Sequence, residues 1–227
     1  MILAALGDIQ GNLPAFQAVL RHIDEAGIQT LLNTGNSVGC APWPCEVLEL
    51  LRARRTFNVL GHLDRSVTQV FRKAASLKKR LDSGTLARIQ WSFDHLPSRE
   101  IEWIKDLPQT TTLRLENTDI CLCHGALDKP FNGLGESDPV ERFQRQREIA
   151  PVPLLVGGNT PQPFSRFVDG TWFVNPGAVG GLQTDEAVYT TIDTEVLPWR
   201  IVVHRVSYDV QAVRDAIASV GLPLPGL

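Results

Sequence analysis

The stretch Ile2-Leu-Ala-Ala-Leu-Gly-Asp-Ile-Gln-Gly-Asn12, together with the helical pattern that follows it, decides the fold of this chain. Residues 2–6 form a short apolar run, which predicts a buried β-strand. Apolar residues then recur at helical spacing over residues 13–23, in a helix that Asn12 caps and Gly27 ends. A strand, a polar turn and a helix in this order begin a strand–helix–strand unit, which predicts a parallel sheet covered by helices.

The same pattern continues through the first half of the chain. Further apolar runs at residues 28–32 and 56–60 flank a helix that starts at Pro44. From Asp64 to about Lys105 the pattern is helical and polar. It includes a basic stretch at residues 72–80 that we interpret as a solvated helix face.

The second half of the chain is rich in predicted strands, which are followed by an amphipathic helix from Asp209 to Val220. The predicted strands cover residues 110–115, 120–123, 152–156, 166–168, 171–174, 187–192 and 200–206. No linker, repeat or low-complexity tract separates the two halves. We therefore expect one α/β domain over residues 1–227, with a helical insertion at about 64–105 and two sheets packed face to face between helices.

Composition excludes several classes of protein. Of 227 residues, 43% are hydrophobic and 21% are charged, and 22 Lys and Arg against 25 Asp and Glu leave a net charge of −3. This balance is typical of a soluble globular protein and argues against nucleic-acid binding, which requires a basic surface. The apolar start lacks a basic flank and a cleavage site, so we expect a cytoplasmic protein without a signal peptide or membrane span. The four cysteines are too few for a disulfide scaffold, and we expect them to be reduced.

Six polar or glycine-rich loops follow the predicted strands. In open α/β folds, ligands bind at the loops that leave the carboxyl ends of the strands, so we expect these six loops to converge on one rim. They are Gly7–Asn12, Thr34–Gly39, Gly61–Asp64, Cys123–Gly125, Gly157–Pro161 and Asn175–Gly180.

The order and spacing of these loops resemble the calcineurin-like metallophosphoesterase superfamily, in particular its compact bacterial phosphodiesterase branch. That family typically reads Asp-x-His-Gly-Asn, Gly-Asp-x-Val-Gly, Gly-Asn-His-Asp, His-Gly, Gly-His-Thr-His and Asn-Pro-Gly-Ser-Val-Gly. The likeness extends to segments without catalytic groups, such as residues 41–48, Leu107-Pro108 and residues 205–209. It implies an α/β/β/α sandwich of two packed mixed sheets flanked by helices. It also implies two divalent metal ions that share a bridging carboxylate and activate water to attack phosphorus.

Compared with this family pattern, the chain keeps the family residue at two of the seven metal-site positions, as Asp8 and His124. The bridging Asp is replaced by Asn36, whose neutral amide cannot readily hold two cations together. Gln10 replaces a histidine, and His62 replaces a metal-binding asparagine.

Further replacements remove three histidines. Leu63 stands where the family has the histidine expected to assist the leaving group, and a leucine side chain cannot transfer a proton. In the Gly-His-Thr-His motif, aligned with residues 158–161, Asn159 and Pro161 replace both histidines. The alignment around Gly157-Gly158 is ambiguous by one residue, but neither register restores a histidine.

This concerted loss predicts a degenerate metal site and a catalytically impaired or inactive protein, a pseudoenzyme of this hydrolase family that acts as a binding or regulatory module. We expect no cofactor, and in particular no dinuclear centre. We expect a small phosphate-containing ligand or a protein partner, with a homo-oligomer compatible with the sequence, and neither nucleic acid nor a membrane as partner. The expected ligand pocket comprises Asp8, Gln10, Asn36, His62, His124 and Asn159.

An alternative is a remodelled phosphoesterase that hydrolyses phosphodiesters or phosphomonoesters. One divalent transition metal (Mn, Fe, Zn or Ni) would be held by Asp8, His62 and His124. In such an enzyme His62 and Asp64 would be the catalytic residues, with Asp64 as proton donor. The same residues also have structural explanations, because Asp8 can close an Asx turn and the histidines can hydrogen-bond in a pocket without metal.

Overall fold

Two five-stranded mixed sheets form the centre of the computed structural model, which describes residues 1–225. The first sheet has the order β10-β9-β1-β2-β3. Strands β1, β2 and β3 are parallel, as the strand–helix–strand pattern predicts, and β9 and β10 extend the sheet in antiparallel orientation. The bounds are β1 Ile2–Leu6, β2 Thr30–Asn33, β3 Arg55–Asn58, β9 Glu186–Asp193 and β10 Arg200–Ser207.

The second sheet has the order β4-β5-β6-β8-β7. Its inner strands β5, β6 and β8 are parallel, whereas β4 and β7 pair antiparallel at the edges. The bounds are β4 Thr110–Leu115, β5 Thr118–Cys123, β6 Leu154–Val156, β7 Phe164–Val168 and β8 Thr171–Asn175. Every strand predicted from the sequence is therefore present, with its ends shifted by no more than about two residues.

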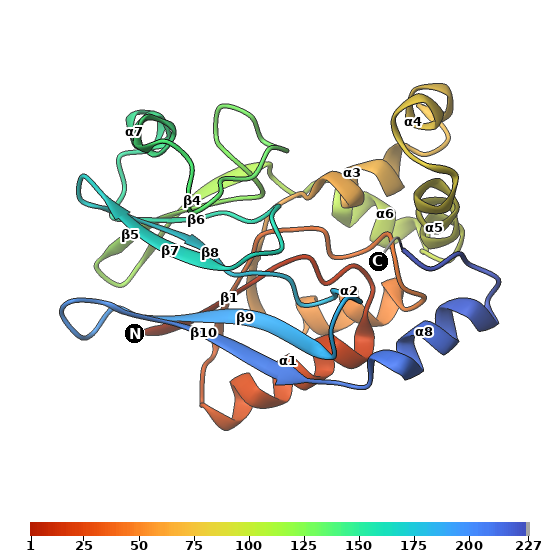
Figure 1. Ribbon diagram of the computed structural model, residues 1–227, viewed down its shortest axis with the longest axis horizontal. Coiled ribbons are helices and arrows are strands. Elements are labelled where there is room, and N and C mark those ends of the chain that lie inside the picture. The colour runs from red at the N-terminus through yellow and green to blue at the C-terminus, as the bar shows by residue number, and fades with distance from the viewer. Residues whose placement is uncertain (226–227) are drawn as a thin grey trace.

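The two sheets pack face to face through an apolar core. Side chains alternate along β1, so that Leu3 and Ala5 lie between the sheets while Ala4 and Leu6 lie in the core under the helices. From the second sheet, Ile120 joins the core between the sheets. Each sheet thus removes one apolar face of the other from water, which stabilises the stack. Figure 1 shows the result, the α/β sandwich expected from the sequence.

Helices cover the outer face of each sheet (Figure 1). On the first sheet lie α1 (Leu13–Glu25), α2 (Pro44–Arg52) and α8 (Val210–Ser219). Helix α1 begins with the expected cap, because Asn12 Oδ1 accepts a hydrogen bond from the backbone N of Ala15 at 3.2 Å. Helix α7 (Val140–Ile149) covers the second sheet and was not predicted. It buries only Phe143 and Gln146, so it has no apolar periodicity to indicate it.

Four helices connect β3 to β4, in the segment where the sequence predicts a helical pattern. They are α3 (His62–Gln69), α4 (Ala74–Arg80), α5 (Ser83–Asp94) and α6 (Ser98–Lys105). Helix α3 starts two residues earlier than expected, so that His62 is its first residue. This start places His62 directly after the loop that follows β3.

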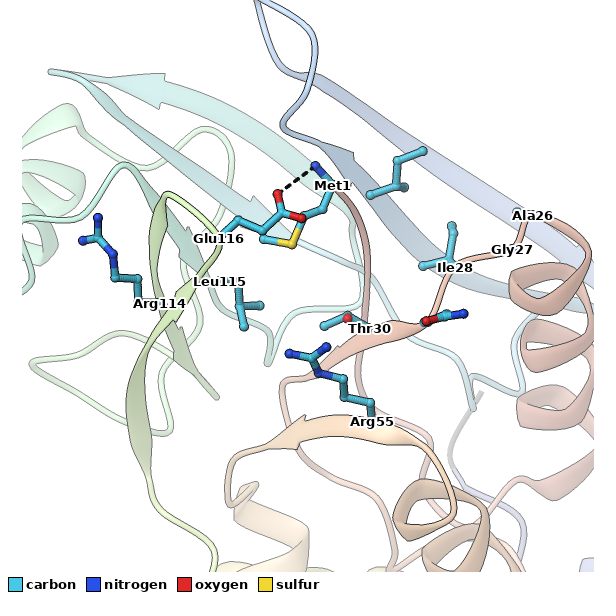
Figure 2. A pocket seen from close by; sticks show the side chains of 11 residues that line it. Met1, Ala26, Gly27, Ile28, Thr30, Arg55, Arg114, Leu115 and Glu116 are labelled. Atoms are coloured by element: carbon cyan, nitrogen blue, oxygen red, sulfur yellow. Dashed lines mark hydrogen bonds and ion pairs between the residues drawn. The ribbon is translucent and has the colours of Figure 1, made fainter.

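A cavity of about 430 Å³ lies at the amino-terminal ends of β1, β2 and β3 (Figure 2). It is lined by residues 1–2, 26–30, 55 and 114–116. The ammonium group of Met1 lies 3.4 Å from Glu116 and 3.2 Å from Glu195, and Arg55 and Arg114 also line this cavity. The six polar loops lie at the opposite, carboxyl ends of the strands.

All four cysteines are free thiols, as expected. Cys40, Cys121 and Cys123 are buried, and burial raises the pKa of each of these thiols. The buried thiols are therefore protonated and serve as small apolar side chains in the core. Throughout residues 1–225, no helix has both the length and the apolar character needed to cross a membrane.

Helix α7 is attached to the second sheet mainly through Phe143, whose ring centroid lies 5.1 Å from that of Phe173 and 6.2 Å from that of Phe164. We expect Phe143→Ala to lower the free energy of unfolding by about 3–5 kcal/mol, because the cavity left behind cannot fully collapse. Denaturant unfolding measures the change. The control is Phe167→Ala, at a ring that is 56% exposed, and it should cost less than about 1 kcal/mol. Equal losses in the two variants would contradict this role of Phe143.

Candidate functional site

Loops from both halves of the chain meet at one rim, as their place at the strand ends predicts. The backbone N of Asp8 donates to the carbonyl of Gly35 at 2.9 Å, and that of Gln10 donates to Asn36 at 2.8 Å. The last loop joins them, because the backbone N of Gly180 donates to the carbonyl of Asp8 at 2.8 Å. A Cβ atom at Gly180 would collide with the Ile9 carbonyl, so only glycine permits this approach.

A pocket of about 260 Å³ opens at this rim, and we call it the candidate pocket. Its lining comprises Asp8, Gln10, Asn36, His62, Leu63, Asn159, Pro161, Ala178, Gly181, Leu182, Gln183 and Pro225. Five of the six pocket residues expected from the sequence are among them. The sixth, His124, is 1% exposed and lies behind His62, with its Nε2 3.0 Å from His62 Nδ1.

The backbone is strained at four of these positions. Asp8, Gln10, Asn36 and Asn159 have φ angles of 49°, 57°, 56° and 64°, in the left-handed region that residues other than glycine rarely adopt. Such conformations persist only where surrounding contacts fix them, and they concentrate at functional sites. Here the hydrogen bonds between loops hold the strained residues around one pocket.

The Asn36 side chain lies at the centre of the polar network. Its Nδ2 donates to Asp8 Oδ1 at 2.6 Å and lies 3.3 Å from His62 Nδ1, while its Oδ1 accepts from the backbone N of Leu63 at 2.8 Å. A flipped amide would place its oxygen against the Asp8 carboxyl and its NH₂ against the Leu63 N–H. The contacts therefore fix the orientation, with the NH₂ group between Asp8 and His62.

The two histidines form a pair behind this amide. His124 Nδ1 donates to the carbonyl of Thr34 at 2.7 Å, so its Nε2 carries the lone pair that faces His62. Burial lowers the pKa of His124 to about 4, so the ring is neutral near pH 7. Burial, together with the charge of Arg80, also lowers the pKa of His62. Neutral imidazoles of this kind can accept hydrogen bonds or bind a metal ion.

Among residues 1–225, Asp8 is the one carboxyl group in the lining of the candidate pocket. Burial raises its pKa to about 7; the hydrogen bond from Asn36 opposes the rise and the Asp64 carboxylate adds to it. About half of the Asp8 side chains are therefore protonated near neutral pH. In its protonated form Asp8 can donate a hydrogen bond to a ligand, and in its ionised form it repels an anion.

Asp64, the expected proton donor, is 1% exposed and does not line the candidate pocket. Its two oxygens accept hydrogen bonds from the backbone N of Val38 and of Gly61, each at 3.1 Å. Burial raises the pKa of Asp64 to about 6, against these hydrogen bonds. The contacts place Asp64 in a structural role, in which it ties the start of α3 to the loop after β2.

The donor groups at the rim do not fit two metal ions. The bridging position presents the NH₂ of Asn36, which is a hydrogen-bond donor and repels a cation. The three residues expected to bind a single metal ion, Asp8, His62 and His124, do not converge on one point. The Asn36 amide lies between Asp8 and the histidine pair. Among residues 1–225, no group of three His, Cys, Asp or Glu side chains is close enough to hold a metal ion.

Several pocket residues were not expected from the sequence. Gly181, Leu182 and Gln183 follow the last predicted loop, and Pro225 lies near the end of the chain. Pro225 reaches the pocket because the segment after α8 returns to the rim, where Arg88 Nη1 donates to the carbonyl of Pro223 at 3.0 Å. No local pattern in the sequence indicates that Pro225 returns to the rim. For the pocket residues at 181–183, the adjacent glycines at 180–181 are a weak signal that the loop continues.

The raised pKa of Asp8 predicts a pH-dependent stability. Between the ordinary value of 3.8 and about 7 the folded state keeps a proton that the unfolded state loses, so stability falls as pH rises through this range. Asp8→Asn removes this effect and should raise the free energy of unfolding by roughly 1–3 kcal/mol at pH 8, with little change at pH 4. Chemical denaturation of both proteins at the two pH values measures it.

The matched control for this test is Asp169→Asn. Asp169 also has a left-handed φ, of 48°, but its side chain is exposed in the turn between β7 and β8. Asparagine adopts the left-handed conformation more easily than aspartate, and Asp169→Asn measures this effect alone. Any further gain in Asp8→Asn then comes from removing the buried charge. A gain for Asp8→Asn that is the same at both pH values, or that the control reproduces, would contradict the role of burial.

Comparison with known proteins places this geometry in a family. The model of the calcineurin-like phosphoesterase superfamily domain matches residues 1–196. Symmetrical bis(5'-nucleosyl)-tetraphosphatase of Nitrosococcus oceani is 34% identical over 133 residues, which cover 56% of this chain and 44% of that protein.

Two solved structures share the fold over nearly their whole length. A hypothetical protein from Pyrococcus horikoshii has a TM-score of 0.88 at 23% identity, covering 98% of this chain and 94% of its own. A metallophosphoesterase from Sphaerobacter thermophilus has a TM-score of 0.76 at 21% identity, with 98% and 95% covered. The family match spans most of the sequence, and this chain therefore belongs to the calcineurin-like phosphoesterase superfamily.

Proposed function

We propose that this protein binds a phosphate-bearing ligand in the candidate pocket and does not hydrolyse it with the two-metal chemistry of its superfamily. It is then a degenerate member of a hydrolase family that serves as a binding or regulatory module. The proposal combines the membership of the superfamily with the loss of metal-binding groups at the rim. The strained backbone of the rim loops supports a functional role for the pocket.

The orientation of Asn36 carries the proposal. In the superfamily pattern this position holds an anionic bridge between two cations, whereas here an NH₂ group points at Asp8 from 2.6 Å. An amide in this orientation stabilises the Asp8 carboxyl without any cation. The side-chain amide of Gln10, which also lines the pocket, provides a hydrogen-bond donor for an anion at the pocket wall.

The protonation of Asp8 suits an anionic ligand. An anion in the pocket lies beside Asp8, and it favours the protonated carboxyl for the same reason that Asp64 does. The bound state therefore takes up a proton, and the affinity should fall as pH rises above about 7. A neutral amide and a protonated carboxyl can each donate a hydrogen bond to a phosphate oxygen, and neither carries a negative charge that would repel it.

Isothermal titration with inorganic phosphate in EDTA, at pH 6 and pH 8, tests this function. We expect binding without metal that weakens at least several-fold at the higher pH. Asn36→Asp should weaken binding by about tenfold or more at pH 8, because it places a second carboxylate against Asp8 and removes a donor. The control is Asn117→Asp, the same change at an exposed position in the turn between β4 and β5.

Metal content and turnover provide the contrary outcome. A stoichiometric transition metal in the purified protein, with a metal-dependent rate on a phosphodiester such as bis(p-nitrophenyl) phosphate, would overturn the proposal. Equal loss of phosphate binding in Asn36→Asp and Asn117→Asp would also count against it, because the candidate pocket would then not be the binding site.

A second candidate function is a phosphoesterase that uses one metal ion. The observation that favours it is the histidine pair, since His62 Nδ1 and His124 Nε2 face each other at 3.0 Å. The hydrogen bond from His124 Nδ1 to the Thr34 carbonyl is also typical of metal-binding histidines, whose second nitrogen is fixed by a carbonyl or carboxylate.

His124→Ala tests the single-metal candidate. If the candidate is correct, the wild-type protein contains close to one zinc, manganese, iron or nickel ion, and the variant loses at least about tenfold in metal affinity. Elemental analysis after dialysis measures both. His204→Ala, on strand β10, is the control and should keep the metal. Equal metal content in wild type and His124→Ala would exclude this candidate.

A further inference from the structure

A second, basic cavity lies beside the candidate pocket and shares His62 with it. Its volume is about 150 Å³. It is lined by His62, Arg65, Ser66, Gln69, Lys73, Ser76, Leu77, Arg80 and Phe131. Among the residues that the structure describes, the lining thus contains three permanent cations (Arg65, Lys73 and Arg80) and no carboxylate. We call this second cavity the basic cavity.

Helical spacing explains how α4 supplies its part of this lining. Leu77 and Arg80 are three residues apart and share one face of the helix, and Lys73, the N-cap residue four positions before Leu77, continues that face just before the helix begins. Leu77 is 4% exposed and packs in the core, which holds that face toward the body of the protein. Lys78 and Lys79 lie on the same helix but do not line the cavity. The basic stretch, interpreted from the sequence as a solvated face, therefore contains two kinds of cation.

The cations of the basic cavity have no carboxylate partners. Within residues 1–225, Arg65, Lys73 and Arg80 form no ion pair. Arg65 instead lies over the ring of Phe131, with its Cζ 5.3 Å from the ring centroid. Cations that line one cavity repel each other, and a bound anion with more than one negative charge relieves that repulsion.

The basic cavity and the candidate pocket are adjacent, and His62 and Phe131 also connect them structurally. His62 lies in the lining of both cavities. The backbone carbonyl of Phe131 accepts a hydrogen bond from the side chain of Asn159, so the wall of one cavity supports the wall of the other. Anions bound in the two cavities would therefore both lie beside the His62 side chain.

We propose that the basic cavity binds a second phosphate group of the ligand held in the candidate pocket, so that this ligand is a diphosphate or bisphosphate. The inference rests on the proposed function. A cavity of about 150 Å³ is smaller than the roughly 300–1,000 Å³ of sites for drug-sized molecules, so it suits a compact anion. Arginine guanidinium groups pair with phosphate oxygens in bidentate fashion, and the lysine adds a point charge.

Titration calorimetry with inorganic pyrophosphate on the full chain, in EDTA, tests the inference. Pyrophosphate should bind at least about tenfold more tightly than orthophosphate, because it reaches both cavities. The double variant Lys73→Ala/Arg80→Ala should weaken pyrophosphate binding by about tenfold or more through loss of charge-assisted hydrogen bonds. Asn36→Asp should weaken it as well, since the other phosphate group lies in the candidate pocket.

The matched control is Lys78→Ala/Lys79→Ala, which removes the same charge from the same helix outside the cavity. We expect it to change pyrophosphate affinity by less than about twofold. Circular dichroism melting curves check that both double variants remain folded.

The outcomes separate this inference from the proposed function. Equal effects of the two double variants would overturn the inference, and a loss in Asn36→Asp alone would then leave the proposed function standing. Loss in Lys73→Ala/Arg80→Ala but not in Asn36→Asp would overturn the idea of a ligand that spans both cavities. No binding of either phosphate compound to the wild-type protein would overturn both.

Discussion

The side-chain amide of Asn36 is the interaction on which the arrangement of the rim depends. Through Asp8 and the backbone of Leu63 it joins the loop after β1, the loop after β2 and the start of α3. An aspartate at this position would bring two carboxylates into contact at the same distance, and the folded rim would then require a cation to offset their repulsion. The amide replaces that cation with a hydrogen bond, so the rim holds together through its own side chains.

The strained backbone explains how the loops hold the shape of the candidate pocket. Left-handed conformations cost of the order of 1–3 kcal/mol each for residues other than glycine, with Asn and Asp at the lower end. Gln10 lacks this advantage, yet its φ is 57°. Its backbone N is bonded to Asn36 and that of Gly11 to Ser37, so contacts between loops over-determine its conformation. The loop geometry is therefore set largely by backbone hydrogen bonds between the loops.

The sequence predicts most of the fold because its signals are local. The apolar runs of the strands and the capped helix after Asn12 are readable from periodicity, whereas α7 buries too little apolar surface to be recognised. Five pocket residues were found through the family resemblance, since they follow strands whose ends must meet. The orientation of the Asn36 amide, the return of Pro225 to the rim and the division of the basic stretch on α4 depend on packing between distant segments. No local pattern encodes them.

Local charge, and not the net charge of −3, decides which ligands the rim accepts. At the amino-terminal ends of the first-sheet strands, the Met1 ammonium is matched by glutamates. At the opposite end, the candidate pocket contains one carboxyl that is half protonated near pH 7, and the cavity beside it contains cations without partners. The basic cavity is therefore lined by cations although the protein as a whole is acidic. A long polyanion would contact these cations over only a small part of its length, whereas a compact anion would lie entirely beside them, which suits the small phosphate ligand proposed for this rim.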